Sequence, residues 1–234
     1  MSRFTPVKSE DDVMQIQRIL LGQTKVTTVF DVGAWIGKTA ASYSEVFSES
    51  VVHAFEPFPE SFAKLKANTG KLDRSILVNE LAVCAEVGEK ILHSNKIETT
   101  NSLLESKSTN SEHDFFRDTI NRISVKTTNL DEYCKTNGVN HINILKVDTQ
   151  GGELEVFRGA SKLLEQGKID LIYCEVSFIA MNEDTPLFHD IVQFFEAYDY
   201  TFHNIYGAVS NEYGQLAWSD AIFYSNRINQ QLKN

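Results

Sequence analysis

This chain of 234 residues contains only three cysteines, Cys84, Cys134 and Cys174, and they form no C-x-x-C pair. A scattered set of odd number argues against a disulfide framework and against a zinc site, and it is typical of buried thiols in a reducing compartment. We therefore expect no metal site to be built from these residues.

Long apolar runs are also missing. The first residues, 1–13, lack the apolar core of a signal peptide, and no run approaches the roughly 20 apolar residues that a membrane-spanning helix needs. Basic residues are outnumbered, with 22 Lys and Arg against 32 Asp and Glu, for a formal net charge of −10. Because nucleic acids and anionic membranes select for a basic face, we expect neither as the main partner, and we expect a cytoplasmic protein.

Short apolar segments alternate with amphipathic ones along most of the chain. This alternation predicts a single α/β domain whose central sheet is doubly wound and mostly parallel. The predicted strands cover 26–32, 50–56, 75–83, 142–148, 169–176, 200–206 and 220–225. The predicted helices between them cover 38–47, 59–70, 152–167 and 186–198.

Two segments lie outside this alternation. In residues 9–22, Val13, Ile16, Ile19 and Leu20 have helical spacing before Gly22, which predicts a helix in an N-terminal extension, 1–25, ahead of the main domain, 26–234. Residues 93–122 are polar and rich in Ser, Thr and Asn, and they separate the third and fourth main strands. A long insertion of this kind is either a functional lid or a solvated surface loop.

The segment FDVGAWIGKT, residues 30–39, is similar to two nucleotide-binding loops and matches neither. A P-loop needs four residues between its first glycine and Gly-Lys-Ser/Thr, whereas only three separate Gly33 from Gly37. The dinucleotide motif G-x-G-x-x-G needs a second glycine where Trp35 stands, so that the backbone can approach a pyrophosphate. The loop therefore indicates a ligand that brings no phosphate to it.

Other predicted strand ends carry groups that suit an adenosine. Glu56 follows Gly33 by 23 residues and could accept hydrogen bonds from both ribose hydroxyls. The segment 79–83, NELAV, offers small apolar residues for an adenine ring, and Asp148 ends the fourth main strand at the same edge. Adenosine without phosphate indicates S-adenosylmethionine as the cofactor.

The ordered set of segments VFDVGAWIGKTAASYS, VHAFEPFPESFAKLKAN, VNELAV, TTNSLLE, VKTTNLDEY and ILKVDTQGGELEVFRGASKLL resembles the FkbM methyltransferases. These are Rossmann-like class I enzymes that use S-adenosylmethionine, and the resemblance extends from about Val26 to Val176. It implies O-methylation of a small-molecule or glycan acceptor. Two positions depart from the family, which commonly has Asn at Trp35 and Glu at Gln150, whereas Glu153 is retained.

The loop, the strand ends and the resemblance together define the candidate residues. For cofactor binding they are Asp31, Gly33, Ala34, Trp35, Gly37, Glu56, Pro57, Phe58, Leu81, Ala82, Ser102 and Asp148. For catalysis they are Asp148, Glu153 and Glu175, any one of which could be the base that assists a weakly nucleophilic hydroxyl. Without a compact D-x-D pattern, we expect no metal.

Several alternatives remain open from the sequence. Asp148 and Glu153 could simply cap or flank the following helix. His189 and His203 lie where the resemblance fades, and either could be a base on the acceptor side. The whole chain could also be a nicotinamide-dependent oxidoreductase, or a non-catalytic binding module on the same scaffold.

Overall fold

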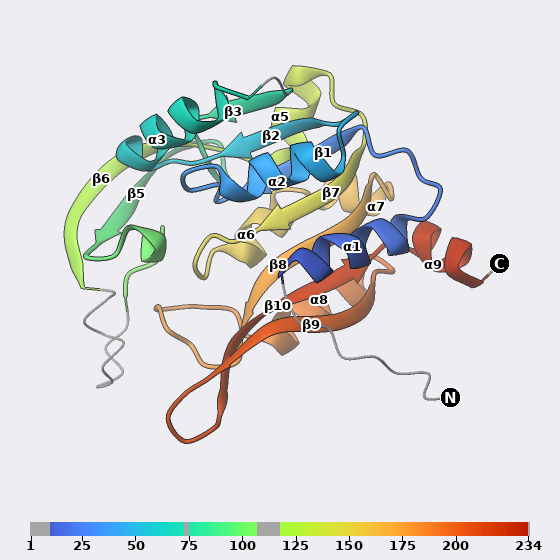
Figure 1. Cartoon of the computed structure of the whole chain (residues 1–234). Helices are drawn as coiled ribbons and strands as arrows, with labels where there is room; N and C mark the ends of the chain where they lie inside the picture. Colours follow the sequence, from blue (N-terminus) through green and yellow to red (C-terminus); the bar gives the residue numbers. More distant parts are fainter. Residues whose placement is uncertain (1–9, 73–74, 107–117, 234) are drawn as a thin grey trace.

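The computed structural model describes residues 10–72, 75–106 and 118–233, and its centre is a seven-stranded sheet (Figure 1). Across the sheet the strands are β3 (Ile76–Asn79), β2 (Val51–Phe55), β1 (Thr28–Val32), β7 (Ile142–Val147), β8 (Ile169–Ser177), β10 (Leu216–Tyr224) and β9 (Thr201–Ser210). β10 pairs antiparallel with both of its neighbours, and the remaining pairs of this sheet are parallel. The predicted mostly parallel, doubly wound α/β fold is confirmed.

Helices cover both faces of this sheet. On one face lie α1 (Glu10–Leu21), α2 (Lys38–Val46), α3 (Pro59–Thr69) and α9 (Asn226–Lys233). On the other lie α5 (Leu130–Asn137), α6 (Glu153–Arg158), α7 (Ser161–Glu165) and α8 (Phe188–Glu196). The predicted N-terminal helix is α1, and Val13, Leu20 and Leu21 pack it against the sheet. No helix in the described ranges is long and apolar enough to cross a membrane.

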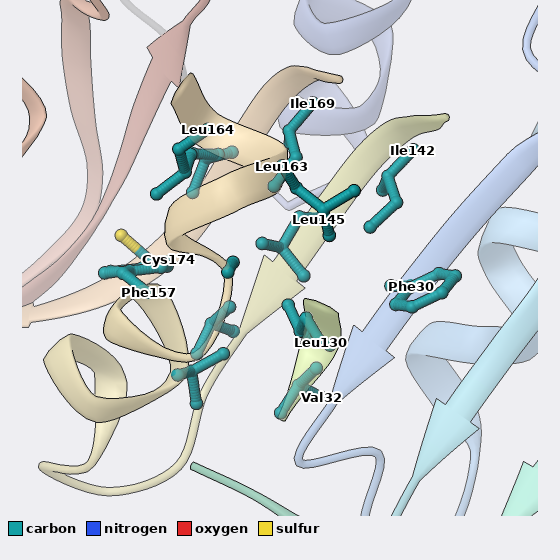
Figure 2. Packing of buried hydrophobic residues seen from close by; sticks show 14 of the residues in the cluster. Phe30, Val32, Leu130, Ile142, Leu145, Phe157, Leu163, Leu164, Ile169 and Cys174 are labelled. Carbon is teal, nitrogen blue, oxygen red and sulfur yellow. The ribbon is translucent and has the colours of Figure 1, made fainter. Parts of the chain in front are cut away.

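The alternation of side chains along each strand divides the core into two clusters. Phe30 and Val32 of β1 point to one face, where they join Leu145 of β7, and Val29 points to the other. Figure 2 shows the first cluster, in which Leu163 of α7 lies beside Leu145 of β7 and Phe157 of α6 lies beside Cys174 of β8. Because both faces are covered, every residue of β7 is buried.

A smaller three-stranded sheet stands beside the main one. It has the order β4 (Ala82–Val83), β6 (Thr119–Thr128) and β5 (Gly88–Asn95), with the short helix η1 (Glu98–Thr100) after β5. The sequence analysis does not predict β5, β6 or η1, because polar residues interrupt their apolar pattern. The ends of the insertion 93–122 are therefore strands, in which His93 pairs with Arg122, and its residues 107–117 lie outside the described ranges.

Two predicted elements are each divided in the structure. The strand predicted over 75–83 is β3 and β4, which belong to different sheets. Its division falls after Asn79, whose side-chain amide donates to the backbone of Ala54 and Leu77. The helix predicted over 152–167 is α6 and α7, separated at Gly159, where a Cβ would lie 2.4 Å from the carbonyl oxygen of Cys84. Helices α5 and α9 were not predicted.

Candidate active site

The candidate site lies where the strand order of the main sheet reverses. The chain passes from β1 to β2 on one side, and β7 pairs with β1 on the other, so the carboxyl ends of β1 and β7 meet (Figure 1). Ligands of doubly wound sheets bind beyond the strand ends at such a point. The fold therefore brings the glycine loop after β1 together with Asp148 after β7.

Gly33 makes this close approach possible. Its φ of 77° is in the left-handed region, and its N–H donates to the carbonyl oxygen of Phe55 at 3.0 Å. A Cβ at this position would lie 1.8 Å from the carbonyl oxygen of Asp148. No side chain could fit there without separating the two strand ends, so this position requires glycine.

A cavity of about 240 Å³ opens at this edge of the sheet. Its walls are the loops after β1, β2 and β7, the segment 81–84, and residues 98–104, which we call the strap. Nine of the predicted cofactor-binding residues line it: Gly33, Ala34, Trp35, Glu56, Pro57, Leu81, Ala82, Ser102 and Asp148. Leu81 and Ala82 form an apolar wall with Leu103 and Leu104 of the strap.

Glu56 is a buried carboxylate in the wall of the cavity, with 8% of its surface exposed. One carboxylate oxygen accepts from the N–H of Trp35 and the other from the N–H of Phe58, each at 2.9 Å. Each oxygen can accept a further hydrogen bond, so the fixed carboxylate can still receive two hydroxyl donors. Burial raises the pKa of Glu56 to about 7 although the two N–H groups act to lower it.

Lys146 is a site residue that the sequence analysis missed. Its ammonium donates to the carbonyl oxygen of Gly33 at 3.0 Å and lies 3.2 Å from Asp31 and 3.7 Å from Asp148. Burial acts to lower the pKa of Lys146, but the two carboxylates outweigh it and raise the pKa above its usual value. A lysine inside the predicted apolar strand 142–148 was the signal that could have identified it.

Gln150 links two of the three predicted catalytic carboxylates. Its side-chain Nε2 donates to Asp148 Oδ1 at 2.9 Å and to Glu175 Oε2 at 3.1 Å. Asp148 follows β7 and lines the cavity, whereas Glu175 lies on the adjacent strand β8 and does not line it. The two carboxylates and the bridging amide thus form one group at the edge of the sheet.

Glu153, the third predicted catalytic residue, is buried and does not line the cavity. Its carboxylate accepts from the N–H and hydroxyl groups of Thr149, at 2.8 and 3.0 Å, and from the N–H of Gly151. Burial raises the pKa of Glu153. In this position the side chain holds the loop that carries Gln150, which agrees with the helix-flanking alternative.

Side chains connect the strap to the loop after β7 and to α3. The hydroxyl of Ser102 donates to the carbonyl oxygen of Gln150 at 2.9 Å. The ammonium of Lys64 on α3 donates to both carboxylate oxygens of Glu98, at 3.0 and 2.9 Å. Ser102 therefore connects the strap to the loop after β7 through a backbone atom.

Three predicted cofactor-binding residues do not line the cavity. Asp31 is fully buried and pairs with Lys146; burial raises its pKa, and the ammonium offsets part of that rise. Gly37 has a φ of 87°, and a Cβ there would lie 2.7 Å from a methyl group of Leu65 on α3. Phe58 packs in the core of the small sheet.

The histidines left open by the sequence also lie elsewhere. His189 is exposed on α8, where it lies 3.4 Å from Asp190. The ring of His203 hydrogen-bonds the hydroxyl of Tyr206 at 2.8 Å. Neither lines the cavity, and in the described ranges no three or more His, Cys, Asp or Glu side chains are placed to hold a metal ion.

Comparison with known proteins identifies sequence relatives. A family model of the methyltransferase FkbM domain matches residues 31–202. The 2-O-methyltransferase NoeI of Sinorhizobium fredii is 29% identical over 156 residues, which are 64% of this chain and 63% of that protein. The hexuronic acid methyltransferase AglP of Haloferax volcanii is 27% identical over 164 residues, 70% of this chain and 61% of that protein. The chain thus spans less than two thirds of the length of either relative.

A solved structure shows the same fold at much lower sequence identity. The METTL16 methyltransferase domain aligns with a TM-score of 0.52 and 11% identity, covering 92% of this chain and 66% of that one. The arrangement of the main sheet is therefore shared with a methyltransferase domain of distant sequence.

Proposed function

Because this chain belongs to the FkbM methyltransferase family, we propose that it transfers the methyl group of S-adenosylmethionine to a hydroxyl group of a sugar or a sugar-like acceptor. The observation that carries the proposal is Glu56, a buried carboxylate fixed by two backbone N–H groups in a cavity that has one apolar wall. The names of the two relatives, a 2-O-methyltransferase and a hexuronic acid methyltransferase, support the acceptor class.

The residues present fit the cofactor of the family. S-adenosylmethionine supplies an electrophilic methyl group when bound. Glu56 would accept hydrogen bonds from the ribose hydroxyls, and the wall of Leu81, Ala82 and Leu103 would contact the purine. The glycine loop leaves its backbone accessible at Gly33 for the polar amino-acid end.

Asp148 is the carboxylate best placed to act on the acceptor. It lines the cavity, and the amide of Gln150 occupies one of its oxygens while the other faces the ammonium of Lys146 at 3.7 Å. A carboxylate has about four acceptor positions, so Asp148 can still orient a hydroxyl and take its proton. Positioning of this kind supplies much of the rate of a displacement reaction. Glu175 would act through Gln150, and Glu153 by holding the loop.

The first experiment is transfer of labelled methyl from S-adenosylmethionine to a panel of neutral sugars, uronic acids, glycolipids and small phenols. We expect label in a sugar or a uronic acid. Label confined to phenols would contradict the acceptor class. Tight binding of S-adenosylhomocysteine without turnover on any acceptor would indicate the binding module, and binding of NADH in its place would indicate the oxidoreductase.

The second experiment separates cofactor binding from proton transfer at Asp148. If Asp148 is the base, Asp148→Asn should lower kcat by the ~10²–10⁴-fold that loss of a general base costs, with cofactor affinity nearly retained. If it mainly holds the cofactor, affinity should fall and kcat at saturation should change less. Wild-type values of both kcat and cofactor affinity would show that another residue acts as the base.

A further inference from the structure

The geometry points to Gln150 as a positioning residue whose amide holds Asp148 and Glu175 together and takes the position of a bridging divalent cation. This inference rests on the proposed function, since it concerns the acceptor side of the same site. It predicts a transferase whose acceptor site is independent of divalent cations and becomes cation-dependent on a single substitution.

The first observation is the position of the amide nitrogen. Nε2 of Gln150 contacts one carboxylate oxygen of Asp148, which follows β7, at 2.9 Å and one of Glu175, on the adjacent parallel strand β8, at 3.1 Å. The ammonium of Lys146 lies 3.7 Å from the other oxygen of Asp148, but it is the amide of Gln150 that contacts both carboxylates and offsets their mutual repulsion. The two amide hydrogens supply partial positive charge at that point, and the amide does not change its protonation with pH.

The second observation is that the backbone of Gln150 is fixed by two separate elements. Its carbonyl oxygen accepts from the hydroxyl of Ser102 at 2.9 Å and from the amide of Asn182 at 2.6 Å. Its φ of 58° is left-handed, which is uncommon for a residue other than glycine. The side chain is therefore directed toward the two carboxylates by the strap on one side and the segment after β8 on the other.

The third observation is the effect of replacing the side-chain nitrogen of Gln150 by an oxygen. In Gln150→Glu an oxygen would replace Nε2, and three carboxylates from positions 148, 150 and 175 would converge. Carboxylate oxygens are the ligands that Mg²⁺, Mn²⁺ and Ca²⁺ prefer, so this variant should bind such a cation, whereas the wild-type amide excludes it by donating to both carboxylates.

The test uses the full chain and titrates Mn²⁺ by calorimetry and by thermal unfolding. We expect Gln150→Glu to bind Mn²⁺ with a dissociation constant on the order of 10⁻⁴–10⁻³ M and to unfold at a higher temperature as Mn²⁺ is added. Wild type and Gln150→Leu should show neither effect. Gln166→Glu, which adds the same charge at an exposed position after α7, is the matched control and should also show neither.

Activity supplies the second measurement. In chelator-treated protein, Gln150→Leu and Gln150→Glu should both lose about 10–100-fold in kcat, since the carboxylates are no longer held in place. Mn²⁺ should restore Gln150→Glu and leave Gln150→Leu unchanged, which a merely structural role would not produce. Wild-type turnover should be the same with and without chelator.

Three outcomes would overturn the inference: saturable Mn²⁺ binding or activation in wild type, no Mn²⁺ binding in folded Gln150→Glu, or full kcat in Gln150→Leu. If Gln150→Glu does not fold, the Mn²⁺ titration of wild type and the kcat of Gln150→Leu still test the inference. If wild type methylates nothing, the proposed function fails while Mn²⁺ binding still tests the bridge. If it does methylate an acceptor and any of the three outcomes occurs, only the bridge fails.

Discussion

At the scale of single residues, Glu56 has a pKa of about 7, raised from 4.5 mainly by burial, and its protonation should therefore control cofactor binding near neutral pH. Ribose hydroxyls donate most favourably to the ionised carboxylate, so affinity for S-adenosylhomocysteine should increase as pH rises through 7 and then level off. Below pH 7 we expect a loss approaching ~10-fold per pH unit, equivalent to about 1.4 kcal/mol. Calorimetry between pH 5.5 and 8.5 measures this dependence.

The matched variants for this prediction are Glu56→Gln and Glu60→Gln. Glu56→Gln should lower affinity at pH 8 by the ~1.5–3 kcal/mol of a hydrogen bond to a charged group and should flatten the pH dependence. Glu60, in the first turn of α3, lies outside the cavity lining, and its variant should keep the wild-type curve. A wild-type curve in Glu56→Gln would exclude Glu56 from the cofactor site.

Lys146 and Asp31 form a buried pair, 7% and 0% exposed. Lys146→Met would leave the Asp31 carboxylate buried without its cation, and such a loss typically destabilises a protein by ~3–5 kcal/mol. Asp31→Asn combined with Lys146→Met removes both charges, so it should recover part of that loss. Urea unfolding of the two single variants and the double variant measures the coupling, and simple additivity of the two single effects would contradict it.

At the scale of elements, the contact between the ends of β1 and β7 depends on Gly33. Gly33→Ala should force the loop after β1 away from Asp148, because its Cβ would lie 1.8 Å from that carbonyl oxygen. We expect affinity for S-adenosylhomocysteine to fall more than about tenfold, since a misplacement of about 1 Å can be that costly. Calorimetry and thermal unfolding measure the two effects.

Gly138 offers the control for backbone strain alone. It ends α5 with a φ of 68°, similar to the 77° of Gly33, but a Cβ there would meet nothing within 4 Å. Gly138→Ala should cost the ~1–2 kcal/mol of a left-handed residue and leave cofactor affinity unchanged. Equal losses of affinity in both variants would show that strain, not the close approach, explains the Gly33 effect.

The sequence predicts best the central strands of the main sheet, because burial on both faces makes their residues mostly apolar. β7 is fully buried and mostly apolar, with Asn143 and Lys146 as its two polar residues, and the residues at the ends of β1, β2 and β7 follow from the topology of the sheet. The strands β5 and β6 were missed because they are exposed on one side and polar. The bridge by Gln150 was also missed, since a pairing between adjacent strand ends has no spacing along the chain that would reveal it.

At the scale of the whole molecule, two buried groups should give opposite responses to acid. The ring of His53 is hard to protonate in the folded protein, because burial lowers its pKa from 6.5 to about 4. Its ring hydrogen-bonds the hydroxyl of Tyr133 at 3.0 Å. The unfolded chain binds a proton there first, so this group makes the fold less stable as pH falls from 6.5 toward 4.

Glu56 acts in the other direction. Its pKa is higher in the fold than in the unfolded chain, so its contribution to stability is fully present below pH 4.5 and is lost as pH rises through about 7. Between pH 4.5 and 6.5 the two contributions should nearly cancel in wild type. Relative to wild type, His53→Asn should gain stability on acidification and Glu56→Gln should lose it, as measured by urea unfolding at pH 4.5, 5.5 and 6.5. Parallel curves for the two variants would contradict this balance.

Among the described residues, those that line the cavity lie between Val32 and Glu155, and Glu175 and Asn182 from the later part of the chain contact Gln150 at its edge. A chimaera that takes its first part, through position 155, from this chain and the rest from a relative should keep the nucleoside affinity of this chain, because it keeps the residues that line the cavity. The partners of Gln150 at positions 175 and 182 would have to be kept in the second part, because they contact Gln150, which belongs to the first part.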